Sequence, residues 1–206
     1  MDKRESKKFQ DLLLHFSKET KETGRHEIEE KLWREYGVEC VVFVLDMSGF
    51  SLLTRKYGII HYLSMVRRMQ LTAEPIVKTY GGSLIKFEAD NCFAVFPDTV
   101  SAIHAAIALQ LAFKSSNLLT TEGFDIRISC GIDYGKILVI GNKECFGDAV
   151  NRACKLGEDV ATAGEILVTQ DAMKTVDAEL EFKLREMNIS ISGINIPAYA
   201  IEYRVE

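Results

Sequence analysis

The chain has 206 residues (23.2 kDa), of which 47% are apolar and 27% charged, the composition of an ordinary globular protein. This length predicts one domain with a short additional segment rather than a multidomain protein. The net charge of −5 and the lack of a basic stripe argue against a nucleic-acid partner, and a polyphosphate ligand would need a metal ion beside it.

Targeting signals and covalent cross-links are not expected. No apolar run reaches the roughly 18–20 residues that a membrane-spanning helix needs, and the charged start does not resemble a secretion signal. We therefore expect no membrane span and a cytoplasmic location. The five cysteines are odd in number, well separated and without a C-x-x-C pair, so free thiols are predicted rather than disulfides or zinc ligands.

Charge density divides the chain near Gly37. The first 36 residues hold 9 basic and 9 acidic side chains, so half of that segment is charged, against 37 of the other 170 residues. Two short apolar stripes at helical spacing predict two helices joined near Gly24, each too short for a coiled coil. Residues 1–37 are expected to form a helical segment that packs on the main domain, residues 38–206, or on a second copy.

Beyond residue 37, buried strands alternate with amphipathic helices. The β-branched and aromatic run 41–45 predicts a central strand. A helix over residues 50–80, kinked at Pro75, should follow. Strands 83–87 and 91–96 form a predicted hairpin. The side chains expected to face inward from the long helix are Leu63, Val66, Ala73, Val77 and Tyr80.

The second half continues this alternation. Pro97 starts an alanine-rich helix, and a further helix should run over residues 147–159. The expected strands are 126–132, 137–140, 166–168, 182–191 and 198–203. The leading order β-α-β-β-α-β predicts an α+β fold: a ferredoxin-like core with additional C-terminal strands, preceded by short N-terminal helices.

Two aspartates follow predicted strands. Asp46 ends the run 41–45, and the free N–H groups of the turn after it, at Gly49 and Phe50, suit a phosphate. Asp90 lies in the hairpin turn. If the first two strands of the ferredoxin-like unit are neighbours, the two carboxylates converge, and they repel unless a divalent cation lies between them. Alone, Asp46 is better explained as a turn or cap residue and Asp90 equally well as a turn residue, but the pair favours Mg²⁺ or Mn²⁺.

A third polar group lies on the helix predicted over residues 147–159. Asn151 and Lys155 are four residues apart, so their side chains share one face, where an amide and a cation can meet one ligand. The alternative is a solvated polar face. The four histidines are scattered, and His104, among alanines, is expected to be a packing residue.

Four motifs together resemble the class III nucleotidyl cyclases, the adenylyl and guanylyl cyclase homology domain, over about residues 38–206. Each motif is weak alone, but four in order at fitting spacings are specific. They are Asp46-Met-Ser-Gly-Phe50, Lys86-x-x-x-Asp90-x-x-x-x-Val95-Phe96, Gly131-Ile-Asp-Tyr-Gly135 and Phe146-Gly-Asp-Ala-Val-Asn151.

The resemblance implies a homodimer with active sites at the interface. Asp46 and Asp90 of one chain would bind two divalent cations, while the other chain contributes the purine-reading positions Lys86 and Glu144. Asn151 would orient the ribose. Lys155, four residues after Asn151, stands where the family usually has an arginine that stabilises the transition state.

The implied reaction is attack of the 3′-hydroxyl of a nucleoside triphosphate on its own α-phosphorus, which gives a 3′,5′-cyclic monophosphate and pyrophosphate. ATP is the expected substrate, with GTP or a pyrimidine triphosphate as alternatives. A Lys86–Glu144 salt bridge without a ligand is the plain alternative for that pair. The N-terminal helices are expected to dock the dimer or to receive a signal from a separate regulatory protein.

Some positions depart from the family pattern. Lys155 cannot reproduce the planar fork of an arginine. Ser192 stands where many relatives have a lysine, and Glu88 and Ala89 replace a frequent apolar-glycine pair, so Glu88 is expected to face outward or to crowd the metals. A catalytically weak homologue that binds nucleotide or only dimerises is therefore the second hypothesis.

Overall fold

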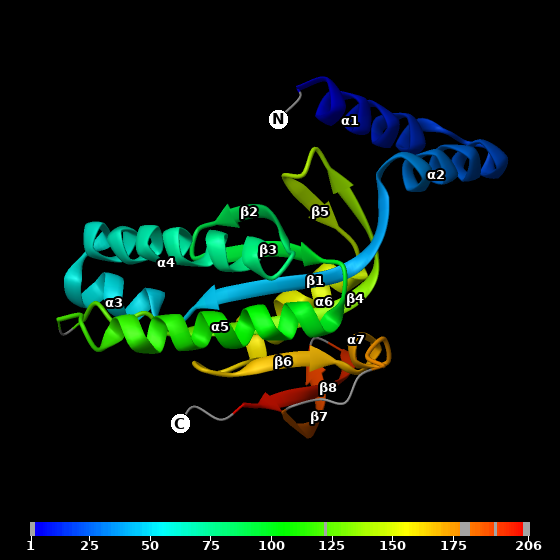
Figure 1. Ribbon diagram of the computed structural model, residues 1–206. Helices are drawn as coiled ribbons and strands as arrows, with labels where there is room; N and C mark the ends of the chain where they lie inside the picture. The colour runs from blue at the N-terminus through cyan, green and yellow to red at the C-terminus, as the bar shows by residue number, and fades with distance from the viewer. Residues whose placement is uncertain (1–2, 122, 178–181, 192, 204–206) are drawn as a thin grey trace.

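The computed structural model describes residues 3–121, 123–177, 182–191 and 193–203, so Ser192 lies outside the described residues. The strands are β1 (Gly37–Met47), β2 (Ser83–Glu88), β3 (Asn91–Phe96), β4 (Ile128–Ile140), β5 (Glu144–Phe146), β6 (Ile166–Thr169), β7 (Lys183–Ile191) and β8 (Ile194–Glu202). The helices are α1 (Lys3–Lys18), α2 (Glu22–Tyr36), α3 (Phe50–Tyr57), α4 (Ile59–Thr79), α5 (Thr99–Asn117), α6 (Asp148–Cys154), the π-helix η1 (Lys155–Val160) and α7 (Gln170–Met173). Figure 1 shows one open sheet flanked by helices, with α1 and α2 projecting at one end.

The strand order is β2-β3-β1-β4-β6-β8-β7, and β5 pairs with β4. The first four strands are therefore arranged as in the ferredoxin-like fold, as the sequence predicts. One expected detail is wrong, because β1 pairs with β3 and not with β2. The β1–β3 register ends at Asp46↔Asn91, so the β2–β3 turn still lies beside the end of β1.

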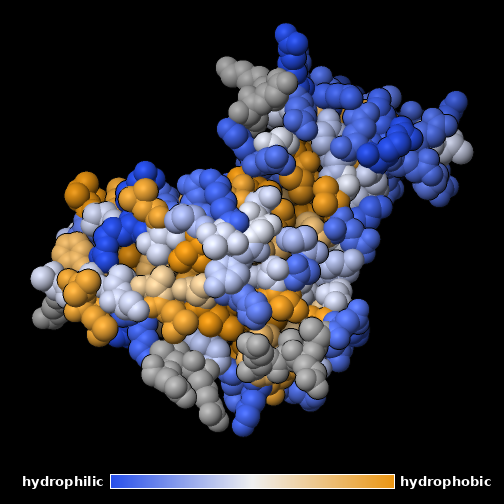
Figure 2. All heavy atoms as spheres, viewed as in Figure 1, coloured by the Kyte–Doolittle hydropathy of each residue, from blue (hydrophilic) through white to orange (hydrophobic). Residues whose placement is uncertain are grey.

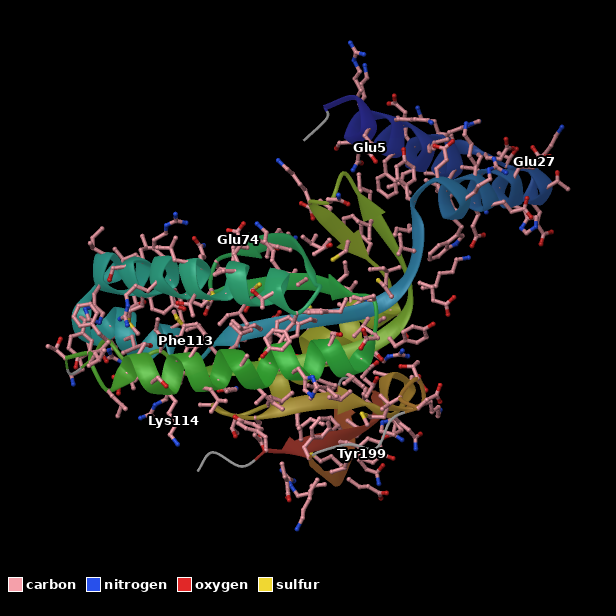
Figure 3. All side chains as sticks on the ribbon, viewed as in Figure 1. Glu5, Glu27, Glu74, Phe113, Lys114 and Tyr199 are labelled. Atoms are coloured by element: carbon pink, nitrogen blue, oxygen red, sulfur yellow. The ribbon has the colours of Figure 1, made fainter. Side chains whose placement is uncertain are left out.

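The two faces of the sheet carry separate hydrophobic cores. α4 and α5 cover one face, where Phe43 and Phe113 are buried. Phe113 points from α5 toward the sheet, whereas its neighbour Lys114 is exposed (Figure 3). α6 covers the other face, where Val44 packs with Ala153. Since side chains alternate along β1, Asp46 lies on the same face as Val44, the face that carries α6.

The helix predicted over residues 50–80 is two helices. Gly58, with φ of 88°, ends α3 and begins α4, a backbone conformation that L side chains rarely adopt. The break resets the helical phase, so Leu63 and Tyr80 are exposed, contrary to expectation, while Met65 and Met69 are fully buried. Within the single helix α4, Pro75 occupies an interior position.

The N-terminal helices turn at residues 19–21, not near Gly24, which lies inside α2. The Glu19 carboxylate accepts the Lys21 N–H at 2.9 Å, and Arg25 Nε donates to the Glu19 carbonyl at 2.7 Å, so side-chain bonds make the turn. The buried residues of the helices pack with Ile140 at the end of β4.

The predicted strand pair over residues 126–140 is a single strand. β4 pairs with β1 continuously from Met47↔Ile128 to Gly37↔Leu138, so the residues expected as a turn, 133–135, lie inside the sheet. The turn signal of Asp133-Tyr134-Gly135 is overridden because β1 supplies a partner along almost the whole strand. The chain instead reverses after Ile140, and the unpredicted strand β5 returns along β4.

No helix in the described part of the chain is long and apolar enough to span a membrane. All five cysteines are free thiols, and Cys154 is the one that is not fully buried.

Candidate active site

Asp46 and Asp90 meet at one end of the sheet. Burial, the nearby Asp90 carboxylate and, more weakly, Glu158 raise the pKa of Asp46 to about 7. Asp90 follows Ala89, whose φ of 50° closes the β2–β3 turn. The buried Tyr62 hydroxyl of α4 donates to Asp90 Oδ2 at 2.6 Å and so fixes the second carboxylate against the helix layer.

These donors fit a hard divalent cation. Two carboxylates converge, and the buried Oδ1 of Asn91, directly across from Asp46 in the sheet, has no hydrogen-bond partner in the described part of the chain. Oxygen donors of this kind suit Mg²⁺ or Mn²⁺. Among the described residues, no group of three or more His, Cys, Asp and Glu side chains is placed to hold a metal ion, so this is a two-carboxylate set.

The raised pKa of Asp46 predicts an unusual pH dependence of stability. The folded pKa of about 7 lies above the unfolded value of about 4, so between these values the folded state holds more protons. The contribution of Asp46 to stability is therefore present below about pH 4 and is lost as the pH rises toward 7. Melting temperatures with a chelator should fall between about pH 5 and pH 8, more than in Asp46→Asn, and Mn²⁺ should restore stability mainly at the higher pH. Equal profiles for both proteins would contradict this assignment.

Gly49 and Phe50 lie where α3 starts. Gly49 has φ of 100°, and its carbonyl accepts the Leu53 N–H at 3.0 Å. The half-exposed Phe50 ring stands edge-on to Tyr62 at 4.7 Å. The turn therefore lies next to the tyrosine that holds Asp90, so a phosphate bound there would lie close to the Asp90 carboxylate.

Lys86 and Glu144 are 58 residues apart in sequence and in contact in the fold. Lys86 Nζ lies 3.0 Å from Glu144 Oε2 and 2.6 Å from Glu88 Oε2, and it lies 5.2 Å from the centroid of the Phe93 ring. Burial lowers the pKa of Lys86, but the bonds to Glu88 and Glu144 outweigh it, and the net shift is upward. Glu88 thus pairs with the lysine, a role that the sequence analysis did not anticipate.

Asn151 and Lys155 share α6 and its C-terminal junction. Asn151 is exposed, and Lys155 is half-buried where α6 changes into the π-helix η1. π-helical turns are rare overall, and many of those known lie at functional sites. α6 lies directly on β4, because a Cβ atom at Gly131 would stand 2.1 Å from the Ala153 carbonyl oxygen. The glycine that begins the motif at 131–135 is therefore needed for this close approach.

An ion-pair network behind α6 was missed by the sequence analysis. Asp133 of β4 is fully buried, and its Oδ2 accepts a bond of 2.6 Å from Arg152 Nε. Burial raises the pKa of Asp133 while Arg152 opposes the rise. The signals in the sequence are a charged residue directly after the apolar run 128–132 and its place in the motif 131–135. Since its guanidinium is held inward, Arg152 is not a replacement for the family arginine missing at Lys155.

A family model described as the adenylate and guanylate cyclase catalytic domain matches residues 34–202 of the chain. In sequence, the chain is 26% identical over 168 residues to the terminal-differentiation-specific adenylate cyclase of Dictyostelium discoideum. That match covers 74% of this chain but 8% of the relative, so the chain corresponds to a small part of that protein.

Solved cyclase structures share the fold. The adenylyl cyclase CyaB from P. aeruginosa has a TM-score of 0.70 and 20% identity, with 82% of this chain and 96% of that chain covered. The guanylate cyclase domain of RhGC from Catenaria anguillulae, solved with GTP, has a TM-score of 0.68 and 19% identity, with 82% and 99% covered. Because the family model covers most of the sequence, the chain belongs to the adenylate and guanylate cyclase catalytic domain family, the class III nucleotidyl cyclases, which are lyases.

Proposed function

We propose that this chain converts a nucleoside triphosphate, ATP in the first place, to its 3′,5′-cyclic monophosphate and pyrophosphate. The observation that carries the proposal is the convergence of Asp46 and Asp90, two carboxylates from distant parts of the chain, beside an oxygen of Asn91 that has no partner among the described residues. Such a set favours cations and, through them, phosphates, which a chain of net charge −5 would otherwise repel.

Each residue has a defined part in this reaction. Two divalent cations held by Asp46 and Asp90 would lower the pKa of the attacking 3′-hydroxyl and neutralise the phosphates. Asn151 donates to the ribose and aims that hydroxyl at the α-phosphorus, and the Lys155 ammonium offsets the negative charge that grows on the phosphate in the transition state. No protein nucleophile is needed.

The pair Lys86 and Glu144 supports adenine as the base. An ammonium has three donors, and the contacts with Glu88 and Glu144 occupy two of them, which leaves one for the adenine N1 acceptor. The Glu144 carboxylate can accept from the adenine N6 amino group. The same two side chains can also bind guanine, Lys86 at O6 and Glu144 at N1–H, so GTP stays the alternative substrate. Cytosine presents the same acceptor and donor as adenine, at N3 and N4, on a smaller ring.

A homodimer with shared sites is part of the proposal. Monomeric proteins rarely expose large contiguous apolar patches, yet α3 and the start of α4 expose several large apolar side chains beside the metal carboxylates. They are Phe50, Leu52, Ile59, Ile60 and Leu63. Figure 2 shows apolar surface over this end of the molecule. In the proposed dimer, a second copy covers this surface and contributes its own Asn151 and Lys155 to the site that holds Asp46. A cytoplasmic location and a separate regulatory protein stay predictions.

Product analysis tests the proposed reaction. The full chain is incubated with ATP, GTP, CTP or UTP and Mn²⁺, and the products are identified by mass. We expect cyclic AMP and pyrophosphate in equal amounts, with less product from the other triphosphates. The presence of Lys155 favours a second candidate, a nucleotide-binding homologue without turnover. Saturable nucleotide binding without any cyclic product would support that candidate and reject the first.

A further inference from the structure

We infer that Arg152 and Asp133 are positioning residues for catalysis: together they clamp α6 to the sheet and hold Asn151 and Lys155 in register with the substrate. The roles of Asn151 and Lys155 rest on the proposed function. The clamp itself rests on contacts within the described chain.

The fixed end of the clamp is Asp133. This carboxylate is the one acidic side chain with no exposed surface among the described residues. Its two oxygens accept hydrogen bonds from three elements of the fold. Oδ1 accepts the Tyr134 N–H at 2.8 Å and a short bond from the Thr169 hydroxyl. Oδ2 is left for Arg152 Nε at 2.6 Å. The carboxylate therefore ties β4, β6 and α6 at one point.

On the α6 side, the clamp consists of the Arg152 guanidinium. Beyond Asp133, its guanidinium donates to Asp148 Oδ2 at 2.8 Å, one turn earlier in α6, and lies 3.6 Å from Asp171 Oδ2 in α7. A planar guanidinium in contact with three carboxylates has little rotational freedom. It fixes both the height of α6 above the sheet and its rotation about its own axis.

α6 needs such an external restraint. It has 7 residues and continues into the 6-residue π-helix η1, and isolated helices shorter than about 12–15 residues are marginal in water, so its position depends on tertiary contacts. Its buried apolar side chains are small: Ala149, Val150 and Ala153. Small side chains let α6 lie close to the sheet but project little into it, and the ion pair at Arg152 adds a directional restraint.

The position of Arg152 explains why catalysis would respond. The residue lies between Asn151 in α6 and Lys155 at the start of η1, so any rotation of the Arg152 turn displaces both. A misplacement of about 1 Å can lower a rate by about 100-fold. Lys86, Glu144 and the partner's metal carboxylates would still bind the nucleotide, so the loss is expected in kcat and not in KM.

Two variants separate positioning from stability. Arg152→Met alone leaves Asp133 buried and unpaired, so a lowered melting temperature is expected. The double variant Asp133→Asn with Arg152→Met removes the charge, and the asparagine Oδ1 can keep both bonds of Asp133 Oδ1. We expect its melting temperature to return close to the wild-type value while kcat stays about 10- to 100-fold low and KM changes by less than about twofold.

Amide hydrogen exchange reports on the clamp without reference to activity. Residues 148–160 of the double variant should exchange about tenfold faster than in the wild type, while α5 is unchanged. Arg185→Met, which breaks an exposed pair with Glu165 at 3.0 Å, is the matched control and should change neither kcat nor exchange in α6.

The outcomes are distinct. Unchanged exchange over residues 148–160 overturns the clamp, whatever the activity. Faster exchange with full recovery of kcat, or a loss confined to KM, overturns the positioning role. If the wild-type chain forms no cyclic product, the proposed function fails, and the exchange measurement still decides whether Arg152 and Asp133 hold α6.

Discussion

Replacing Asp46 by asparagine is expected to lower the rate of cyclic nucleotide formation by about 10²- to 10³-fold or more, with either Mg²⁺ or Mn²⁺. The amide cannot supply the negative charge that holds the cations. Because the variant also removes a buried carboxylate that repels Asp90, its melting temperature above about pH 7 should equal or exceed that of the wild type. Loss of activity in a protein of full stability would thus assign Asp46 to the chemistry.

A mixing experiment shows whether the site is shared between chains. Asp46→Asn and Asn151→Ala proteins should each be inactive alone. When the two are mixed and allowed to exchange partners, half of the dimers are mixed and each holds one intact site, so about a quarter of the wild-type activity should return. Substantial turnover by Asp46→Asn alone would reject the metal assignment, and no recovery on mixing would reject the shared site. Glu74→Gln, on the exposed side of α4 (Figure 3), is a matched carboxylate control and should behave as wild type.

Lys155→Ala is expected to lower kcat by about 10²- to 10³-fold, because the variant loses a positive charge that acts on the transition state. Lys155→Arg should raise kcat above the wild-type value, since a planar guanidinium can bind two phosphate oxygens at once. Both variants should leave the Mn²⁺ dependence unchanged, because Asp46 and Asp90, the proposed metal ligands, are not altered. Steady-state kinetics with the preferred triphosphate, at several Mn²⁺ concentrations, measures kcat and the Mn²⁺ dependence of both variants.

The matched control for Lys155 is Lys114→Ala, which removes an exposed lysine from α5 on the other face of the sheet. An unchanged kcat in Lys155→Ala would show that this lysine does not stand in for the family's arginine. Arg152 would not then be the replacement, because its guanidinium is held by Asp133.

Local patterns determined much of the fold and the candidate site. The β-branched run 41–45 gave a buried strand, and the hairpin over residues 83–96 formed as predicted around Ala89 and Asp90. Short-range signals suffice there, because a strand run and a turn are specified by residues within a few positions of one another. The pairs Asp46/Asp90 and Lys86/Glu144 were named from ordered motifs, and the fold brings each pair together.

What the sequence did not determine depends on partners distant in the chain. The turn signal at 133–135 was overridden because β1 runs beside β4 and pairs with its backbone groups. Apolar spacing predicted one helix over residues 50–80, but Gly58 divides it into two. The pairing of Glu88 with Lys86 and the burial of Asp133 against Arg152 also arise only when separate elements pack. The sequence does not show whether a charged side chain is solvated or buried, because its burial and its counter-charge depend on the elements that pack around it. The sequence by itself thus named the candidate site residues, and the tertiary structure decided which of them lie together and what holds them in place.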